Sequence, residues 1–225
     1  MGSPVKKTVE LFYDVISPYS WLAFEVLTRY KTKWNMDLQL KPFFLGGIMQ
    51  GAGNRPPGLV PNKMAYMDQD LKRLGGYFRV PLKAPSDPAD VMFNKGSLAA
   101  MRYVLSVDLL QKEKTEPISR EFWMRVWSRD EDITKPESFL QAAAKAQLSD
   151  DVAKTALEKM TTDEIKNKLK ANTQEALDMG TFGAPTIILH KDGEKHLFFG
   201  GDRFELMAHI MGEKWEGPLP ELSKM

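Results

Sequence analysis

The spacing of hydrophobic and polar positions changes along this chain of 225 residues. Over residues 8–15 polar and apolar side chains alternate, and Phe12 adds an apolar side chain to the otherwise polar face, which predicts a central strand. Residues 18–30 carry apolar side chains at helical spacing, and residues 38–45 alternate again. This order predicts a β-α-β unit at the beginning of the chain.

The middle of the chain is predicted to be helical. Residues 46–61 are rich in Gly and Pro, so we expect a long loop there. Beyond them, nearly every periodic segment has helical spacing, and Ser, Thr and Asp at the expected starts favour N-caps. The expected helices are residues 63–74, 88–109, 116–128, 136–146, 150–160 and 162–178.

Strand character returns after Gly180. Residues 186–190 are β-branched and apolar, the Asp192-Gly193 pair is a hairpin signal, and residues 196–199 pair back. Residues 202–211 form a last amphipathic helix. The chain therefore ends in a β-β-α unit.

The two end units together have the arrangement of thioredoxin. We predict an α/β fold in which residues 1–50 and 180–225 form a thioredoxin-like domain. Residues 51–179 form an all-helical insertion domain, as in DsbA-like proteins. No internal repeat and no low-complexity segment interrupts this order.

Composition excludes several classes of protein. The chain is 43% hydrophobic and 27% charged, as expected for a globular fold with a proper core. Its net charge of +1 gives no general attraction to nucleic acid or to anionic membranes. No apolar run approaches the roughly 18 residues of a membrane-spanning helix. The absence of cysteine excludes disulfides, thiolate zinc sites and a cysteine nucleophile.

A four-residue motif, Ser17-Pro18-Tyr19-Ser20, follows the first strand and opens a helix. Thioredoxin-like proteins carry Cys-x-x-Cys at this place. Ser17 followed by Pro18 is also a favoured helix start, so Ser17 alone could serve only as a cap. The second interpretation is functional, because a hydroxyl beside the free N–H groups of a helix N-terminus can stabilise a substrate's thiolate.

Pro185 precedes a predicted buried strand, where proline removes a ladder hydrogen bond. A cis Ala184–Pro185 bond in a tight turn explains this position, and a trans proline at a sheet edge is the alternative. In a thioredoxin fold such a turn lies opposite the motif. It leaves the backbone of Ala184 free to pair with an extended peptide ligand.

Five motifs in order resemble the kappa class of glutathione transferases. They are Ser17-Pro18-Tyr19-Ser20-Trp21, Asn54-Arg55-Pro56-Pro57-Gly58, Trp123-Met124-Arg125-Val126-Trp127, Phe182-Gly183-Ala184-Pro185 and Phe199-Gly200-Gly201-Asp202-Arg203. The resemblance covers residues 8–218. It implies a thioredoxin-like domain with a helical insertion, glutathione as co-substrate without a further cofactor, a small electrophile as second substrate, and a homodimer.

The resemblance also implies roles for individual residues. Ser17 is the catalytic serine, and the glutathione contacts are Ser17, Pro18, Tyr19, Asn54, Lys63, Ala184, Pro185, Gly201 and Asp202. Many members carry Ser at the place of Gly201 and Leu at the place of Ala184. Without the resemblance, Lys63 is a solvated lysine, Asn54 holds a turn and Asp202 caps the last helix.

Three functions stay open at this point. The first is conjugation of glutathione to electrophiles in detoxification, with peroxidase activity possible. The second is a glutathione-dependent isomerase of the 2-hydroxychromene-2-carboxylate type. The third is a thioredoxin-fold binding protein without catalysis.

Two further expectations concern metal and location. His190, His196 and His209 are scattered, so we predict no metal site. Ser223-Lys224-Met225 is similar to the peroxisomal Ser-Lys-Leu signal. Relatives of this kind also imply the mitochondrial matrix, although residues 1–7 lack an Arg-rich amphipathic leader.

Overall fold

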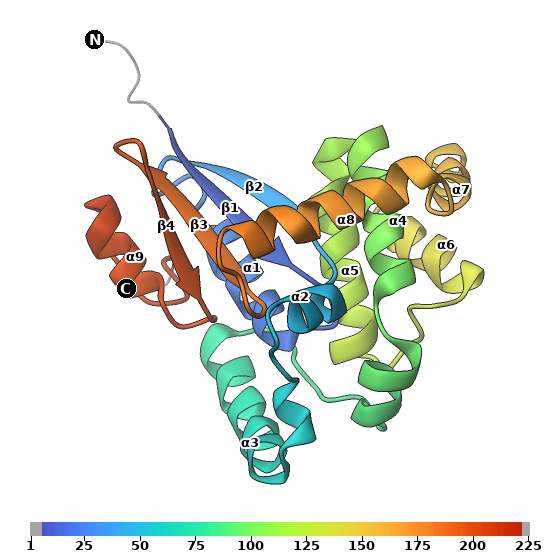
Figure 1. Cartoon of the computed structure of the whole chain (residues 1–225), viewed down its shortest axis with the longest axis horizontal. Coiled ribbons are helices and arrows are strands. Elements are labelled where there is room, and N and C mark those ends of the chain that lie inside the picture. Colours follow the sequence, from blue (N-terminus) through green and yellow to red (C-terminus); the bar gives the residue numbers. More distant parts are fainter. Residues whose placement is uncertain (1–5, 222–225) are drawn as a thin grey trace.

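The computed structural model describes residues 6–221, and a four-stranded sheet lies at its centre (Figure 1). The strands are β1 (Lys7–Tyr13), β2 (Met36–Pro42), β3 (Thr186–Lys191) and β4 (Glu194–Phe199), in the order β2-β1-β3-β4. β2 runs parallel to β1, whereas β3 is antiparallel to β1 and β4 is antiparallel to β3. The two ends of the chain thus share one sheet, as the sequence predicts.

The strand β1 is buried on both faces, which confirms the prediction of a central strand. Val9 and Leu11 point into the main hydrophobic core together with α1 (Pro18–Tyr30). Phe12 points the other way, into a smaller core that includes Ile48 and Ile188. The side chains of a strand alternate between its two faces, and each face of β1 is covered by a core. The residue between Leu11 and Tyr13 would be polar in a strand with one face in solvent, but here it is the apolar Phe12.

The helix α1 begins and ends where the sequence predicts. Ser17 is its N-cap and Pro18 its first residue. Pro is suited to this position because the missing N–H would have no helical partner there. The buried face of α1 packs on the sheet and includes Trp21, Leu22, Phe24, Val26, Leu27 and Tyr30.

The segment between β2 and β3 is mainly helical. It consists of α2 (Leu45–Gly51), the 3-10 turn η1 (Pro57–Leu59), α3 (Pro61–Phe78), the π-helix η2 (Asp90–Lys95), α4 (Leu98–Leu110), the 3-10 turn η3 (Lys112–Lys114), α5 (Thr115–Trp127), α6 (Pro136–Lys145), α7 (Asp150–Lys159) and α8 (Asp163–Asp178). After β4 comes α9 (Phe204–Met211).

The prediction of a loop over residues 46–61 is wrong in its first part, where α2 forms. The N–H of Leu45 donates to the Asp14 carboxylate at 2.9 Å, and Ile48 is fully buried in the smaller core. A Cβ on Gly51 would lie 2.6 Å from Leu177 on α8. Tertiary packing therefore stabilises a helix that the glycine-rich sequence disfavours.

The prediction of one helix over residues 88–109 is also wrong, because the helix is divided into η2 and α4. Gly96 lies between them with a φ of +65°, a conformation in which a helix cannot continue. Ser97 then precedes α4, but its hydroxyl donates to Asp14 at 2.8 Å instead of capping the helix.

The hairpin after β3 is confirmed, with positive φ at both Asp192 and Gly193.

The main core is continuous from the sheet into α4 and α5. The division at residues 50 and 180 into two domains therefore stays a prediction. Ser223-Lys224-Met225 lies outside the described residues, and its targeting role also stays a prediction.

Candidate functional site

Ser17 lies at the junction of α1 and the Ala184 turn, and it is only 6% exposed. Its Oγ accepts a hydrogen bond from the N–H of Ser20 at 3.1 Å, so the predicted helix cap is confirmed. The same hydroxyl donates to the carbonyl oxygen of Ala184 at 3.4 Å. That distance is long for an O–H···O bond. The hydroxyl hydrogen can therefore turn toward an anion with little loss.

The Ala184–Pro185 bond is cis, as predicted from the sequence. The N–H groups of Ala184 and of Tyr19, near the start of α1, have no hydrogen-bond partner within residues 6–221. Together with the hydroxyl of Ser17 they form a group of donors at a helix N-terminus, where the helix dipole favours negative charge. This end of α1 can therefore stabilise a thiolate.

Asp14 fixes the segment that carries the motif. The carboxylate is fully buried and accepts hydrogen bonds from the N–H of Ile16, the N–H of Leu45 and the hydroxyl of Ser97, at 2.8–3.0 Å. Burial raises the pKa of the Asp14 carboxyl to about 6, and the three hydrogen bonds oppose this rise only in part. One carboxylate thus connects the motif, α2 and the start of α4.

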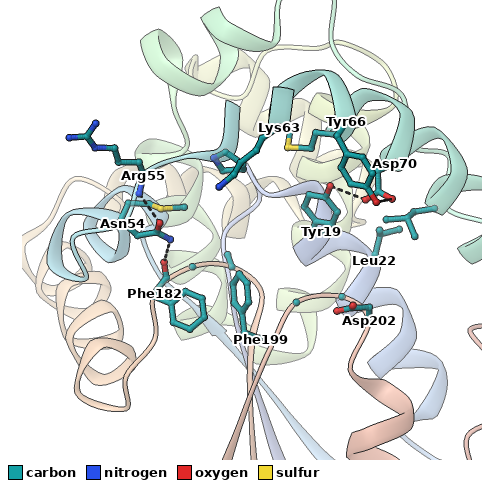
Figure 2. A pocket seen from close by; sticks show the side chains of 18 of the residues that line it. Tyr19, Leu22, Asn54, Arg55, Lys63, Tyr66, Asp70, Phe182, Phe199 and Asp202 are labelled. Atoms are coloured by element: carbon teal, nitrogen blue, oxygen red, sulfur yellow. Dashed lines mark hydrogen bonds between the residues drawn. The ribbon is translucent and has the colours of Figure 1, made fainter. Parts of the chain in front are cut away.

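A pocket of about 790 Å³ opens next to Tyr19, at the start of α1, and Ala184 (Figure 2). Residues from α1, α2, α3, the segment that leads into α3, and the turns around Ala184 and Gly201 surround it. Its lining consists of Tyr19, Leu22, Met49, Asn54, Arg55, Pro57, Asn62, Lys63, Tyr66, Met67, Asp70, Leu74, Phe182, Gly183, Ala184, Phe199, Gly200, Gly201 and Asp202. A volume of this size is typical of a site for a small molecule.

Both signs of charge are present in this pocket. Lys63 and Arg55 bring cations whose side chains have no polar partner in the described part of the chain. Asp202 and Asp70 bring carboxylates, and Figure 2 shows Asp202 on the side of the pocket opposite Lys63. A ligand with separate positive and negative groups matches this distribution.

Tyr19 and Tyr66 both donate to Asp70, at 3.1 Å and 3.3 Å. Burial raises the pKa of the Tyr19 phenol, and the negative charge of Asp70 raises it further. Tyr19 is therefore a neutral hydrogen-bond donor at physiological pH, and its bond to Asp70 connects α1 with α3.

Asn54 holds a turn, as the simpler interpretation of the sequence predicts. Its Nδ2 donates to the carbonyl of Phe182 at 2.7 Å, and its Oδ1 accepts from the N–H of Arg55 at 2.8 Å. An amide carries two N–H groups, so one remains for a ligand. Asn54 thus fixes the approach to Ala184 while it lines the pocket.

Asp202 does not cap the last helix. The N-cap of α9 is Arg203, which makes no side-chain cap. The carboxylate of Asp202 is instead exposed toward the pocket, 3.7 Å from the guanidinium of Arg203. Gly201 is buried, and a Cβ there would lie 3.3 Å from the carbonyl of Tyr19. Gly201 therefore lets this turn approach the motif.

The structure brings together six of the predicted site residues around the pocket: Tyr19, Asn54, Lys63, Ala184, Gly201 and Asp202. Ser17, Pro18 and Pro185 are buried directly beside it, where they position the helix start and the turn. Whether each contacts a ligand stays a prediction.

Sequence reasoning missed Asp14, Tyr66 and Asp70. The spacing of four between Tyr66 and Asp70 placed both on one helix face and was the available signal. Asp14 showed a weaker signal, as an acid that ends a buried strand directly before the motif.

Trp123 is structural. It is fully buried, packs at a tilt against Tyr13 and Phe24, and donates its Nε1 hydrogen to the carbonyl of Ser17 at 3.1 Å. No group of three potential metal ligands occurs within residues 6–221. In the same range, no helix has both the length and the apolar character needed to cross a membrane.

The second serine of the motif, Ser20, provides a first prediction. Its Oγ is buried and has no hydrogen-bond partner in the described part of the chain. We expect Ser20→Ala to leave the free energy of unfolding unchanged or to raise it by up to about 1 kcal/mol, because an unpaired polar group leaves the core. Urea unfolding measures this, and a loss above about 1 kcal/mol would contradict the unpaired state.

Comparison with known proteins identifies the family of this chain. Residues 8–212 match the DSBA-like thioredoxin domain. Glutathione S-transferase kappa 1 of Homo sapiens is 53% identical over 217 residues, which cover 96% of each chain, and that of Rattus norvegicus is 46% identical over 96% of each chain. The fold is similar to that of a 2-hydroxychromene-2-carboxylate isomerase, with a TM-score of 0.73, 18% identity and 91% and 94% of the two chains covered. The chain belongs to the kappa-class glutathione transferases, within the DsbA-like thioredoxin family.

Proposed function

We propose that this protein conjugates the thiol of glutathione to small electrophiles. The observation that carries the proposal is the group of donors at the start of α1. The Ser17 hydroxyl and the free N–H of Tyr19 lie beside a pocket with both signs of charge. Membership in the kappa class supports the same reaction.

Thiolate formation is the step that these donors assist. A free thiol has a pKa of about 8.5, and lowering it to about 6.5 requires roughly 3 kcal/mol. A hydrogen bond to the charged sulfur supplies about 1.5–3 kcal/mol, and a helix terminus adds about 0.3–2 kcal/mol. The hydroxyl of Ser17 and the dipole of α1 together reach the required size.

The charges of the pocket suggest how glutathione lies. Asp202 is placed for the ammonium of the γ-glutamyl end, and Lys63 and Arg55 are placed for a carboxylate. Between them, the free N–H and the carbonyl of Ala184 suit the backbone of the cysteinyl residue. This orientation brings the sulfur to Ser17.

The electrophile then occupies the apolar part of the pocket. Leu22, Met67 and Leu74 line this part. The thiolate sulfur attacks an electrophilic carbon, a carbon–sulfur bond forms, and a leaving group such as halide departs with the bonding electron pair. Fixed positions of both reactants and a preformed thiolate supply most of the rate.

The test is an incubation with glutathione and an aryl halide, in which both conjugate and remaining glutathione are measured. We expect one glutathione consumed for each halide released. With a cis/trans-isomerisable enone as substrate, product without net loss of glutathione would instead indicate the isomerase. No binding of glutathione in calorimetry would indicate a binding protein without this chemistry.

We also propose a homodimer. Large apolar side chains are exposed along η1 and α3, namely Leu59, Val60, Met64, Tyr66 and Tyr77. An exposed apolar surface beside a functional site is typical of an interface. Light scattering is expected to give twice the mass of 25.5 kDa, and the mass of one chain at micromolar concentration would contradict the dimer.

A further inference from the structure

A second cavity lies between α4, α8 and the beginning of α2 and has a volume of about 670 Å³. None of its lining residues lines the glutathione pocket. Its walls are partly apolar, with Phe44, Leu98, Leu169 and Leu177. Both the volume and the apolar lining are in the range of a small-molecule site.

Three cations share this cavity: Arg102 from α4, and Lys166 and Lys170 from α8. No acidic residue belongs to the part of its lining that the structure describes. Lys166 is 3.3 Å from Asp163, whose side chain is exposed. The cavity is therefore positive as well as apolar.

Arg102 is the most informative of the three. Its Nε is buried, and its guanidinium has no hydrogen bond and no ion pair within residues 6–221. Lys170 likewise has no partner there. A buried Nε–H without a partner in a half-buried guanidinium costs free energy, whereas a bound anion would satisfy the planar set of donors.

We propose that this cavity binds a small amphipathic organic anion. Its carboxylate, sulfate or sulfonate group pairs with Arg102 and Lys170, and its aromatic or aliphatic body packs on Phe44 and Leu169. Charge complementarity selects the anion, and the apolar walls select an organic body over an inorganic ion. The site does not depend on the chemistry at Ser17.

The probe for this proposal is 8-anilinonaphthalene-1-sulfonate, an aromatic sulfonate whose fluorescence rises in an apolar environment. Titrations are made with S-hexylglutathione at saturation, so that the glutathione pocket is filled. We expect Lys170→Glu and Arg102→Met each to weaken binding of the probe by about tenfold or more, because each removes a charge-assisted contact.

Lys168→Glu is the matched control, because Lys168 is exposed on the same helix and does not line the cavity. It makes the same change of charge and is expected to alter binding less than about twofold. Conjugation activity should be unchanged in all three variants. An equal loss for Lys168→Glu and Lys170→Glu would overturn the proposal, because the effect would then come from net charge.

The neutral analogue N-phenyl-1-naphthylamine separates the charge from the apolar body. We expect it to bind at least about tenfold more weakly than the sulfonate and to be insensitive to Lys170→Glu. Equal binding of both dyes, or loss of the sulfonate when S-hexylglutathione is added, would overturn the proposal. Inorganic sulfate that displaces the dye at a concentration equal to that of the dye would also overturn the proposal. The apolar walls would then contribute nothing to the binding free energy.

Discussion

Ser17→Ala is expected to reduce kcat/KM for conjugation at about pH 6.5 by roughly tenfold to a hundredfold, because the thiolate loses a hydrogen bond of about 1.5–3 kcal/mol. The pKa of the thiol of bound glutathione should rise by about one to two pH units. The loss should therefore shrink as the pH rises toward about 9, where the thiol ionises without help. A pH–rate profile of the variant that coincides with the wild type would contradict the role of Ser17.

Two variants separate this effect from damage to the helix. Ser17→Ala also removes an N-cap, which costs about 1 kcal/mol of stability. Ser17→Gly loses the hydroxyl but only a few tenths of the capping free energy, about 0.3 kcal/mol. Equal losses of activity in both variants would indicate the hydroxyl. Ser20→Ala controls for substitution within the motif and should keep the wild-type profile. Ser20 Oγ has no hydrogen-bond partner in the described part of the chain, Ser20 does not line the pocket, and its bond to Ser17 comes from the backbone N–H, which the substitution keeps.

The buried Asp14 should make stability depend on pH in an unusual direction. Its pKa is raised from 3.8 to about 6 in the folded protein, so between these values the folded chain binds more protons than the unfolded chain. The contribution of Asp14 to the free energy of unfolding should therefore be highest below about pH 4 and fall by about 3 kcal/mol up to about pH 6. Most paired carboxylates have the opposite effect, because their folded pKa is lowered.

The measurement is the difference in free energy of unfolding between wild type and Asp14→Asn over this range of pH. As the pH falls from about 7 to about 4, the free energy of unfolding of the wild type should rise by about 3 kcal/mol relative to that of the variant. If the variant does not fold, carbon NMR of the Asp14 carboxyl gives the titration directly. A difference that is independent of pH, or a carboxyl that titrates near its usual pKa of about 4, would contradict the account.

Sequence patterns predicted the elements that depend on local spacing. The bounds of α1 follow from Ser17, Pro18 and a continuous apolar face, and those of the hairpin follow from Asp192-Gly193. The helix α2 could not be predicted, because tertiary contacts stabilise it: Asp14 accepts from the N–H of Leu45, and Gly51 packs on Leu177. At the break after Gly96, Ser97 donates to Asp14, which lies 83 positions away in the chain, and this contact was equally hidden in the sequence.

The site was predictable where one motif carried several of its residues. Tyr19 and Asp202 followed from the resemblance of their motifs, and both line the pocket. Asp70 was not predicted, because its role as acceptor for Tyr19 arises only when α3 folds over α1. The second cavity was equally hidden, since Arg102 and Lys170 line one cavity only in the tertiary structure.

We propose that the start of α1 ionises the thiol of a bound substrate, a group that the cysteine-free chain does not itself possess. The most direct test is a titration of the ultraviolet absorbance of the thiolate in the saturated complex with glutathione. We expect an apparent pKa of about 6.5 for the bound thiol, which shifts upward in Ser17→Ala. Glutathione that is bound at saturation and still protonated at about pH 8 would contradict it.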